Sequence, residues 1–278
     1  MLGIGASVLD AERAPRPEVT QRGGGALVAE NGNDTTWLRE FRTAARPRAV
    51  LVCFPPGGGS ASAYRDLARG IGEGVEVLAV QYPGRQDRLG DPMVADIGEM
   101  ADRVAADVLV SEPSAPLALF GHSMGATVAF ETARRLEAEG RTPVRLFVSG
   151  RIAPSAPYPG RLHDAPDADL IAELERLAND PAAVAVLRTE PGLADLVLPA
   201  VRNDYRAVET YRCQPGDLLR CDISALLGAD DPTVTAEQAR AWQDHTTGEF
   251  ELATFPGRHF YLDERPSEIA EFVAARLP

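Results

Sequence analysis

The residues most indicative of the fold in this 278-residue chain are Leu117-Ala-Leu-Phe-Gly-His-Ser-Met-Gly-Ala126. This stretch starts with a short apolar run typical of a buried strand, and residues 126–136 carry the pattern of a helix. Between the two stands a G-x-S-x-G sequence, whose small residues let a strained strand-to-helix turn project the serine hydroxyl. Ser123 is therefore the candidate nucleophile. Taken alone, the five residues also fit a purely structural glycine-rich turn. A catalytic role for Ser123 therefore requires that the chain also supply an acid and a base.

Apolar strand-like runs alternate with helical patterns along most of the chain. The predicted strands cover residues 49–54, 75–80, 117–120, 144–149, 221–227 and 250–255. Helices are predicted from about residues 62 and 97, and over 126–136, 235–244 and 266–277. This alternation is the βαβ pattern of a parallel sheet. Together with the serine turn, it predicts an α/β-hydrolase fold, with a mostly parallel central sheet flanked by helices.

Two parts of the chain depart from this alternation. Residues 1–34 show no sustained periodicity and predict a flexible N-terminal extension, which leaves 35–278 as the catalytic domain. Between about 154 and 214 the strand signals disappear, and amphipathic helices are predicted over 167–178 and 192–211. We expect these residues to form a helical lid inserted into the domain.

Composition restricts the partners. The 28 basic and 41 acidic side chains give a net charge of −13, which opposes binding to nucleic acid or to an anionic membrane surface. No stretch approaches the roughly 20 apolar residues that span a bilayer, and the N-terminus lacks a basic leader, so we expect a cytoplasmic protein, present as a monomer.

The chain contains no lysine, which excludes a Schiff base or a Ser-Lys dyad. Cys53, Cys213 and Cys221 lack metal-ligand spacing and are expected to be free thiols, and we expect no metal or other cofactor.

The acid and base that a serine nucleophile needs follow in the chain order Ser, acid, His. Asp230 and Asp231 come directly after the strand predicted over 221–227, and the G-x-x-D spacing favours Asp231. The other aspartate of the pair then only shapes the turn. His259 follows the last predicted strand, where the general base belongs.

The three other histidines fit structural roles better. His122 is expected to point away from the serine and to pack or make a polar contact. His163 opens the predicted lid and His245 ends a predicted helix, so both are expected at the surface.

A tetrahedral oxyanion needs preorganised hydrogen-bond donors. The backbone N–H of Met124, directly after the nucleophile, is one expected donor, and the loop Phe54-Pro-Pro-Gly-Gly-Gly-Ser60 supplies the other. We place this second donor at Gly57. The loop lacks the Gly-Lys-Ser/Thr ending of a phosphate-binding loop.

Five ordered blocks of sequence together resemble one family. They are Cys53-Phe-Pro-Pro-Gly-Gly-Gly-Ser60, Gln81-Tyr-Pro-Gly-Arg-Gln-Asp-Arg88, Ala118-Leu-Phe-Gly-His-Ser-Met-Gly-Ala126, Leu198-Pro-Ala-Val-Arg-Asn-Asp-Tyr205 with Glu209-Thr-Tyr211, and His259-Phe-Tyr-Leu262. The blocks are similar to those of the type II thioesterases associated with polyketide synthases and nonribosomal peptide synthetases. The resemblance runs from about Trp37 to the C-terminus.

The resemblance implies hydrolysis of acyl groups from the phosphopantetheine thiol of an acyl or peptidyl carrier protein, which clears aberrant or stalled units. It also implies Ser123, Asp231 and His259 as the triad, with backbone donors at Gly57 and Met124. The chain departs from the family where it has Pro56-Gly57 in place of a frequent His-Ala. It departs again at Arg258, where glycine is frequent, and Arg258 is expected to alter the loop or to contact an anionic part of the substrate.

The resemblance leads to two further expectations. Apolar residues of the lid are candidates for the wall of the acyl chamber, although packing of the lid explains each of them equally well; they are Leu193, Leu196, Val197 and Leu198. Carrier proteins are usually acidic, so local arginines must complement them, and Arg85 and Arg88 are candidates. Binding is expected to be weak and transient.

Other functions fit the same motifs. A generic carboxylesterase or lipase would prefer oxygen esters, and an acyltransferase would use an acceptor other than water. A noncatalytic binding protein on this scaffold usually lacks a triad member, and all three candidates are present here.

Overall fold

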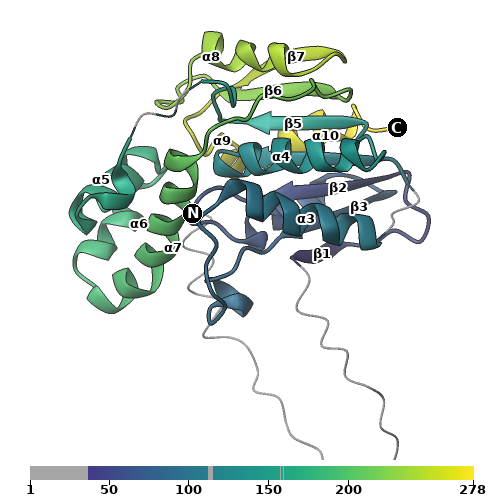
Figure 1. Cartoon of the computed structure of the whole chain (residues 1–278). Coiled ribbons are helices and arrows are strands. Elements are labelled where there is room, and N and C mark those ends of the chain that lie inside the picture. The colour runs from purple at the N-terminus through teal and green to yellow at the C-terminus, as the bar shows by residue number, and fades with distance from the viewer. Residues whose placement is uncertain (1–36, 112–114, 157, 159) are drawn as a thin grey trace, which may run out of the picture.

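The computed structural model describes residues 37–111, 115–156, 158 and 160–278. The predicted N-terminal extension, residues 1–34, lies outside this part of the chain. Figure 1 shows a central sheet with helices on both sides and a separate group of helices beyond one end of the strands. No helix in the described residues is long and apolar enough to cross a membrane.

The sheet has seven strands in the order β1-β3-β2-β4-β5-β6-β7. The bounds are β1 Leu38–Arg42, β2 Ala49–Phe54, β3 Val75–Val80, β4 Leu117–His122, β5 Arg145–Ser149, β6 Asp222–Gly228 and β7 Phe250–Phe255. Strands β2 to β7 pair in parallel, and β1 pairs antiparallel with β3. The predicted mostly parallel α/β sheet is confirmed.

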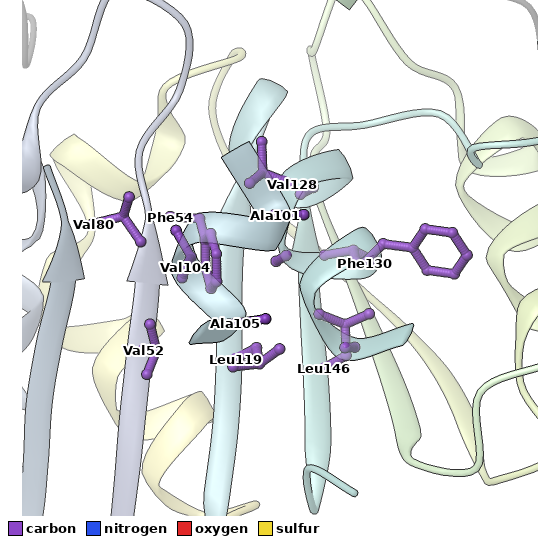
Figure 2. Close-up of a cluster of buried hydrophobic side chains, with 14 of the residues drawn as sticks. Val52, Phe54, Val80, Ala101, Val104, Ala105, Leu119, Val128, Phe130 and Leu146 are labelled. Atoms are coloured by element: carbon purple, nitrogen blue, oxygen red, sulfur yellow. The ribbon is translucent and has the colours of Figure 1, made fainter. Parts of the chain in front are cut away.

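Alternating residues of each central strand pack against different helices. Val50 and Val52 of β2 belong to a cluster with α3 (Ile97–Ser111) and α4 (Met124–Ala138). Leu51 and Cys53 belong to a second cluster with α2 (Arg65–Gly70) and α10 (Pro266–Ala274). Figure 2 shows part of the first cluster, where Leu119 of β4 lies beside Ala105 of α3. Because helices cover both faces, the strands read as continuous apolar runs.

The chain between β5 and β6 forms the separate group of helices, here called the insertion. It contains α5 (Asp167–Leu177), α6 (Pro181–Ala185) and α7 (Pro191–Thr210), with short 3₁₀ turns at Leu162–Asp164 and Val186–Arg188. Its apolar side chains form their own cluster, which Phe260 joins from the loop after β7. The insertion therefore lies beyond the carboxyl ends of the parallel strands, toward which the arrowheads of β2 and β5 point (Figure 1).

Short 3₁₀ turns and short helices complete the fold. The helix predicted from residue 62 is a 3₁₀ turn, Ala61–Tyr64, continued by α2, and another turn covers Gln86–Arg88. The predicted helix over 235–244 is α8 (Ala236–Arg240) followed by a 3₁₀ turn at Ala241–His245, and α9 (Tyr261–Glu264) precedes α10. Strand β1 was not predicted, because the sequence Leu-Arg-Glu-Phe-Arg has three charges in five residues and lies half-buried at the sheet edge.

Candidate active site

Ser123 lies between β4 and α4 with a positive φ of 53° and a ψ of −121°, a backbone conformation that is strained for any residue except glycine. Two close backbone approaches explain the glycines around it. A Cβ on Gly125 would lie 2.0 Å from the carbonyl oxygen of Phe54, and a Cβ on Gly121 would lie 2.2 Å from the carbonyl oxygen of Gly125. The turn is thus pressed against the end of β2. Only glycine fits at either position without moving the backbone. This close packing fixes the position of the Ser123 Cα and Cβ atoms.

His259 lies after β7, and its ring is almost fully buried. Its Nδ1 lies 2.9 Å from Oδ2 of Asp231, whose side chain has no exposed surface. The other carboxylate oxygen of Asp231 accepts hydrogen bonds from the backbone N–H and the hydroxyl of Thr233, at 2.8 and 2.7 Å. Burial alone would raise the pKa of Asp231, but the bonds from His259 and Thr233 outweigh it, so the pKa lies below the usual value. Asp231 is therefore ionised and holds Nδ1 of His259, whereas Asp230 is exposed.

Thr233 is a residue of this network that the sequence analysis missed. A local sequence signal could have found it. An aspartate followed two residues later by a threonine is typical of a turn in which the carboxylate accepts a hydrogen bond from the backbone N–H of that later residue.

The remaining histidines have structural roles, as expected, but His163 and His245 are less exposed than predicted. His122 points into the core, where its Nδ1 lies 2.9 Å from the hydroxyl of Ser149. His163 and His245 are half-buried, so they are only partly at the surface. Nδ1 of His163 bonds the buried carboxylate of Glu209, and His245 is half-buried beside the Phe130 ring.

The backbone N–H groups of Gly57 and Met124 have no hydrogen-bond partner among the described residues. Met124 is the first residue of α4, where a helix leaves its N–H groups free. A Cβ on Gly57 would lie 4.0 Å from Cβ of Met124, so the two residues are neighbours. The structure therefore brings together the two positions at which the sequence placed oxyanion donors.

A pocket joins these groups, and its wall is mostly apolar. It is lined by Pro56, Gly57, Ser123, Met124, Gly150, Arg151, Ile152, Tyr158, Leu174, Leu177, Asp204, Tyr205, Val208, Thr233, His259 and Phe260. The insertion contributes through α5 and α7. The four lid residues proposed from the sequence do not line it. Val197 and Leu198 pack inside the insertion, and Leu196 is 42% exposed.

The arginines expected to meet a carrier protein are buried instead. Arg85 forms an ion pair with Asp204, and Arg88 donates to the carbonyl of Gln81 and stacks over the ring of Trp37. Both side chains are less than one tenth exposed, so neither can present its charge to a partner protein. Arg258 donates to the carbonyl oxygen of Arg176 at the end of α5, which ties the loop of His259 to the insertion.

The three cysteines are free thiols, as predicted, with Cys53 and Cys221 buried. Burial raises the pKa of the Cys221 thiol to about 12, so it carries no thiolate near neutral pH. Within the described ranges, no group of three or more His, Cys, Asp or Glu side chains is placed to hold a metal ion.

A serine on a sharp turn, a histidine bonded to a buried aspartate, and a parallel sheet with a helical insertion define an α/β-hydrolase. Comparison with known proteins specifies the class further. Residues 49–277 match the Thioesterase domain family. The chain therefore belongs to the thioesterase family, whose members are hydrolases acting on thioesters.

Similar curated proteins are also thioesterases. The chain is 40% identical to "Thioesterase PikA5" of Streptomyces venezuelae, over 89% of this chain and 87% of that protein. It is 44% identical to "Probable cadicidin biosynthesis thioesterase" of Streptomyces griseus, over 87% of this chain, but it spans only 66% of that protein's length.

A solved structure agrees. The type II thioesterase BorB from the borrelidin biosynthetic cluster superposes with a TM-score of 0.78 at 45% identity, covering 88% of this chain and all of that one. The predicted resemblance to type II thioesterases is confirmed.

Proposed function

We propose that this protein hydrolyses acyl thioesters from the phosphopantetheine arm of acyl or peptidyl carrier proteins, and so removes aberrant or stalled units during polyketide or nonribosomal peptide biosynthesis. The observation that carries the proposal is the mostly apolar pocket that Ser123 and His259 share with the free N–H groups of Gly57 and Met124. Such a pocket suits an acyl chain whose carbonyl lies at the serine.

In this proposal the hydroxyl of Ser123 attacks the thioester carbonyl while His259 takes its proton. Asp231 holds the imidazole through Nδ1 and stabilises the imidazolium. The N–H groups of Gly57 and Met124 donate to the oxyanion. The tetrahedral intermediate then breaks its C–S bond, and the thiol leaves with the proton from His259. Water, deprotonated by His259, then attacks the acyl-serine. The C–O bond to Ser123 breaks, Oγ takes back the proton from His259, and the carboxylic acid leaves.

A thiol leaving group reduces the demand on His259, because a thiol has a pKa of roughly 8.5 and leaves more easily than an amine. The net charge of −13 gives no long-range attraction to an acidic carrier. We therefore propose a weak, transient encounter, with recognition resting on the arm and the acyl group. A monomeric state and a cytoplasmic location stay predictions.

The test compares three propionyl donors with the same acyl group: the loaded carrier protein, a short free thioester, and a small oxygen ester. The proposal expects kcat/KM to fall in that order. A preference for the oxygen ester, with the carrier left loaded, would instead identify a carboxylesterase. A product in which propionyl is transferred to an added alcohol or amine in preference to water would identify an acyltransferase.

A further inference from the structure

A buried ion pair joins the insertion to the catalytic end of the sheet. Arg85 follows β3, and Asp204 lies on α7, 119 residues further on. The guanidinium of Arg85 donates to both carboxylate oxygens of Asp204, at 2.6 and 2.9 Å. The side chain of Arg85 is 6% exposed and that of Asp204 is fully buried. Burying two charges away from water has a large desolvation free energy, and replacing a buried ion pair with apolar side chains often leaves stability unchanged. Its position therefore suggests a role other than holding the fold.

Both members of the pair also hold the loop that carries Gly57. The backbone N–H of Gly58 donates to Asp204 at 2.7 Å, and Arg85 donates to the carbonyl oxygen of Gly59 at 3.1 Å. A Cβ on Gly57 would lie only 3.5 Å from Cβ of Asp204. Asp204 and Arg85 thus fix the two residues after Gly57 by charge-assisted hydrogen bonds.

We propose that Arg85 and Asp204 are positioning residues that hold the N–H of Gly57 where the oxyanion forms. This inference rests on the proposed function, since it assigns the loop its task in the same reaction. Because Asp204 belongs to α7, the loop is held in place only while α7 is seated against it. The insertion therefore contributes to the chemistry as well as to the wall of the pocket.

Arg85 also neutralises the negative charge of Asp204 close to the reacting carbonyl. Asp204 lines the same pocket as Ser123 and Gly57. An unneutralised carboxylate there would oppose the negative charge that develops on the thioester oxygen. Arg85 cancels that charge. Losing Arg85 should therefore harm catalysis more than losing the charge of Asp204.

The experiment compares Asp204→Asn, Arg85→Gln and the double variant with the wild type. Steady-state kinetics on the propionyl-loaded carrier give kcat and KM. The inhibition constant of an alkyl trifluoromethyl ketone, which adds Ser123 to form a tetrahedral oxyanion, reports the oxyanion site directly. Circular dichroism melting shows which variants are folded. Glu175→Gln is the matched control, because Glu175 and Arg188 form a bidentate pair within the insertion, away from the pocket.

We expect Asp204→Asn to lower kcat about 10-fold and Arg85→Gln about 100-fold, the cost of a misplaced or opposed oxyanion donor, with little change in KM. Ketone affinity should fall in parallel. In the Asp204→Asn background, Arg85→Gln should add little, because the pair acts as a unit. Glu175→Gln should change none of these values.

Folded variants that keep wild-type kcat and ketone affinity would overturn the inference, and so would an equal effect of Glu175→Gln. If either single variant fails to fold, the other decides. A wild type that leaves the carrier loaded but binds the ketone would contradict the proposed function alone. Ketone affinity would then still test the positioning of the loop.

Discussion

The imidazole rings of His122 and His259 face each other in the core, with centroids 4.9 Å apart and planes inclined by 43°. His122 is wholly buried, and its Nε2 has no hydrogen-bond partner among the residues that the structure describes. Burial, and then the neighbouring His259, lower the pKa of His122 well below the usual 6.5. His122 is thus a neutral ring against which His259 packs.

This burial predicts a pH dependence of stability. As pH falls below about 6.5, the unfolded chain protonates His122 while the folded chain does not, so the free energy of unfolding falls by up to about 1.4 kcal/mol per pH unit. His122→Gln should remove this contribution and flatten the decline. Urea unfolding of both proteins at neutral pH and about one unit below 6.5 measures the difference. Parallel declines would mean that His122 is protonated in the folded protein.

The two aspartates of the turn after β6 should differ sharply. Asp231→Asn leaves His259 without the anion that fixes its tautomer, and we expect kcat to fall about 10³- to 10⁴-fold. Asp230 is exposed, so Asp230→Asn should leave kcat within about twofold of wild type. The reverse ranking in steady-state kinetics would transfer the acid to Asp230.

Thr233 should affect catalysis through its hydroxyl. Thr233→Val removes one donor to Asp231 and keeps the shape of the side chain, and a bond to a charged group contributes about 1.5 kcal/mol or more, so kcat/KM should fall roughly 10-fold. Thr233→Ser keeps the donor and should remain near wild type. A Thr233→Val variant with wild-type kcat/KM, beside a weakened Thr233→Ser, would show that the methyl group and not the hydroxyl matters.

The backbone strain at Ser123 should be measurable as stability. Ser123→Gly and Ser123→Ala both remove the nucleophile, but only glycine accepts φ 53° without strain. We expect the glycine variant to be more stable than the alanine variant by about 1 kcal/mol, because relieved strain of 1–3 kcal/mol exceeds the entropic cost of glycine. Denaturant unfolding compares them. A less stable glycine variant would show that the turn stores no strain.

The sequence was sufficient wherever a residue's place follows from a strand end. Ser123, Asp231 and His259 each come within a few residues of the end of a strand, and carboxyl ends of parallel strands meet at one edge. The Arg85–Asp204 pair has no such local signal, because 119 residues separate its members and only the packing of α7 brings them together. The predicted lining of the pocket was wrong for a related reason. The apolar side chain of Val197 indicates that the residue is buried, but the sequence does not say which neighbour it packs against.

Intact-protein mass spectrometry can follow directly whether Ser123 releases acyl groups from a carrier protein. A propionyl-loaded carrier protein is incubated with wild type or with Ser123→Ala. We predict that the carrier loses the mass of the propionyl group with wild type only, and that the variant slows this loss on the order of 10⁴-fold or more. Loss of the propionyl group at a similar rate with Ser123→Ala would show that Ser123 is not the nucleophile.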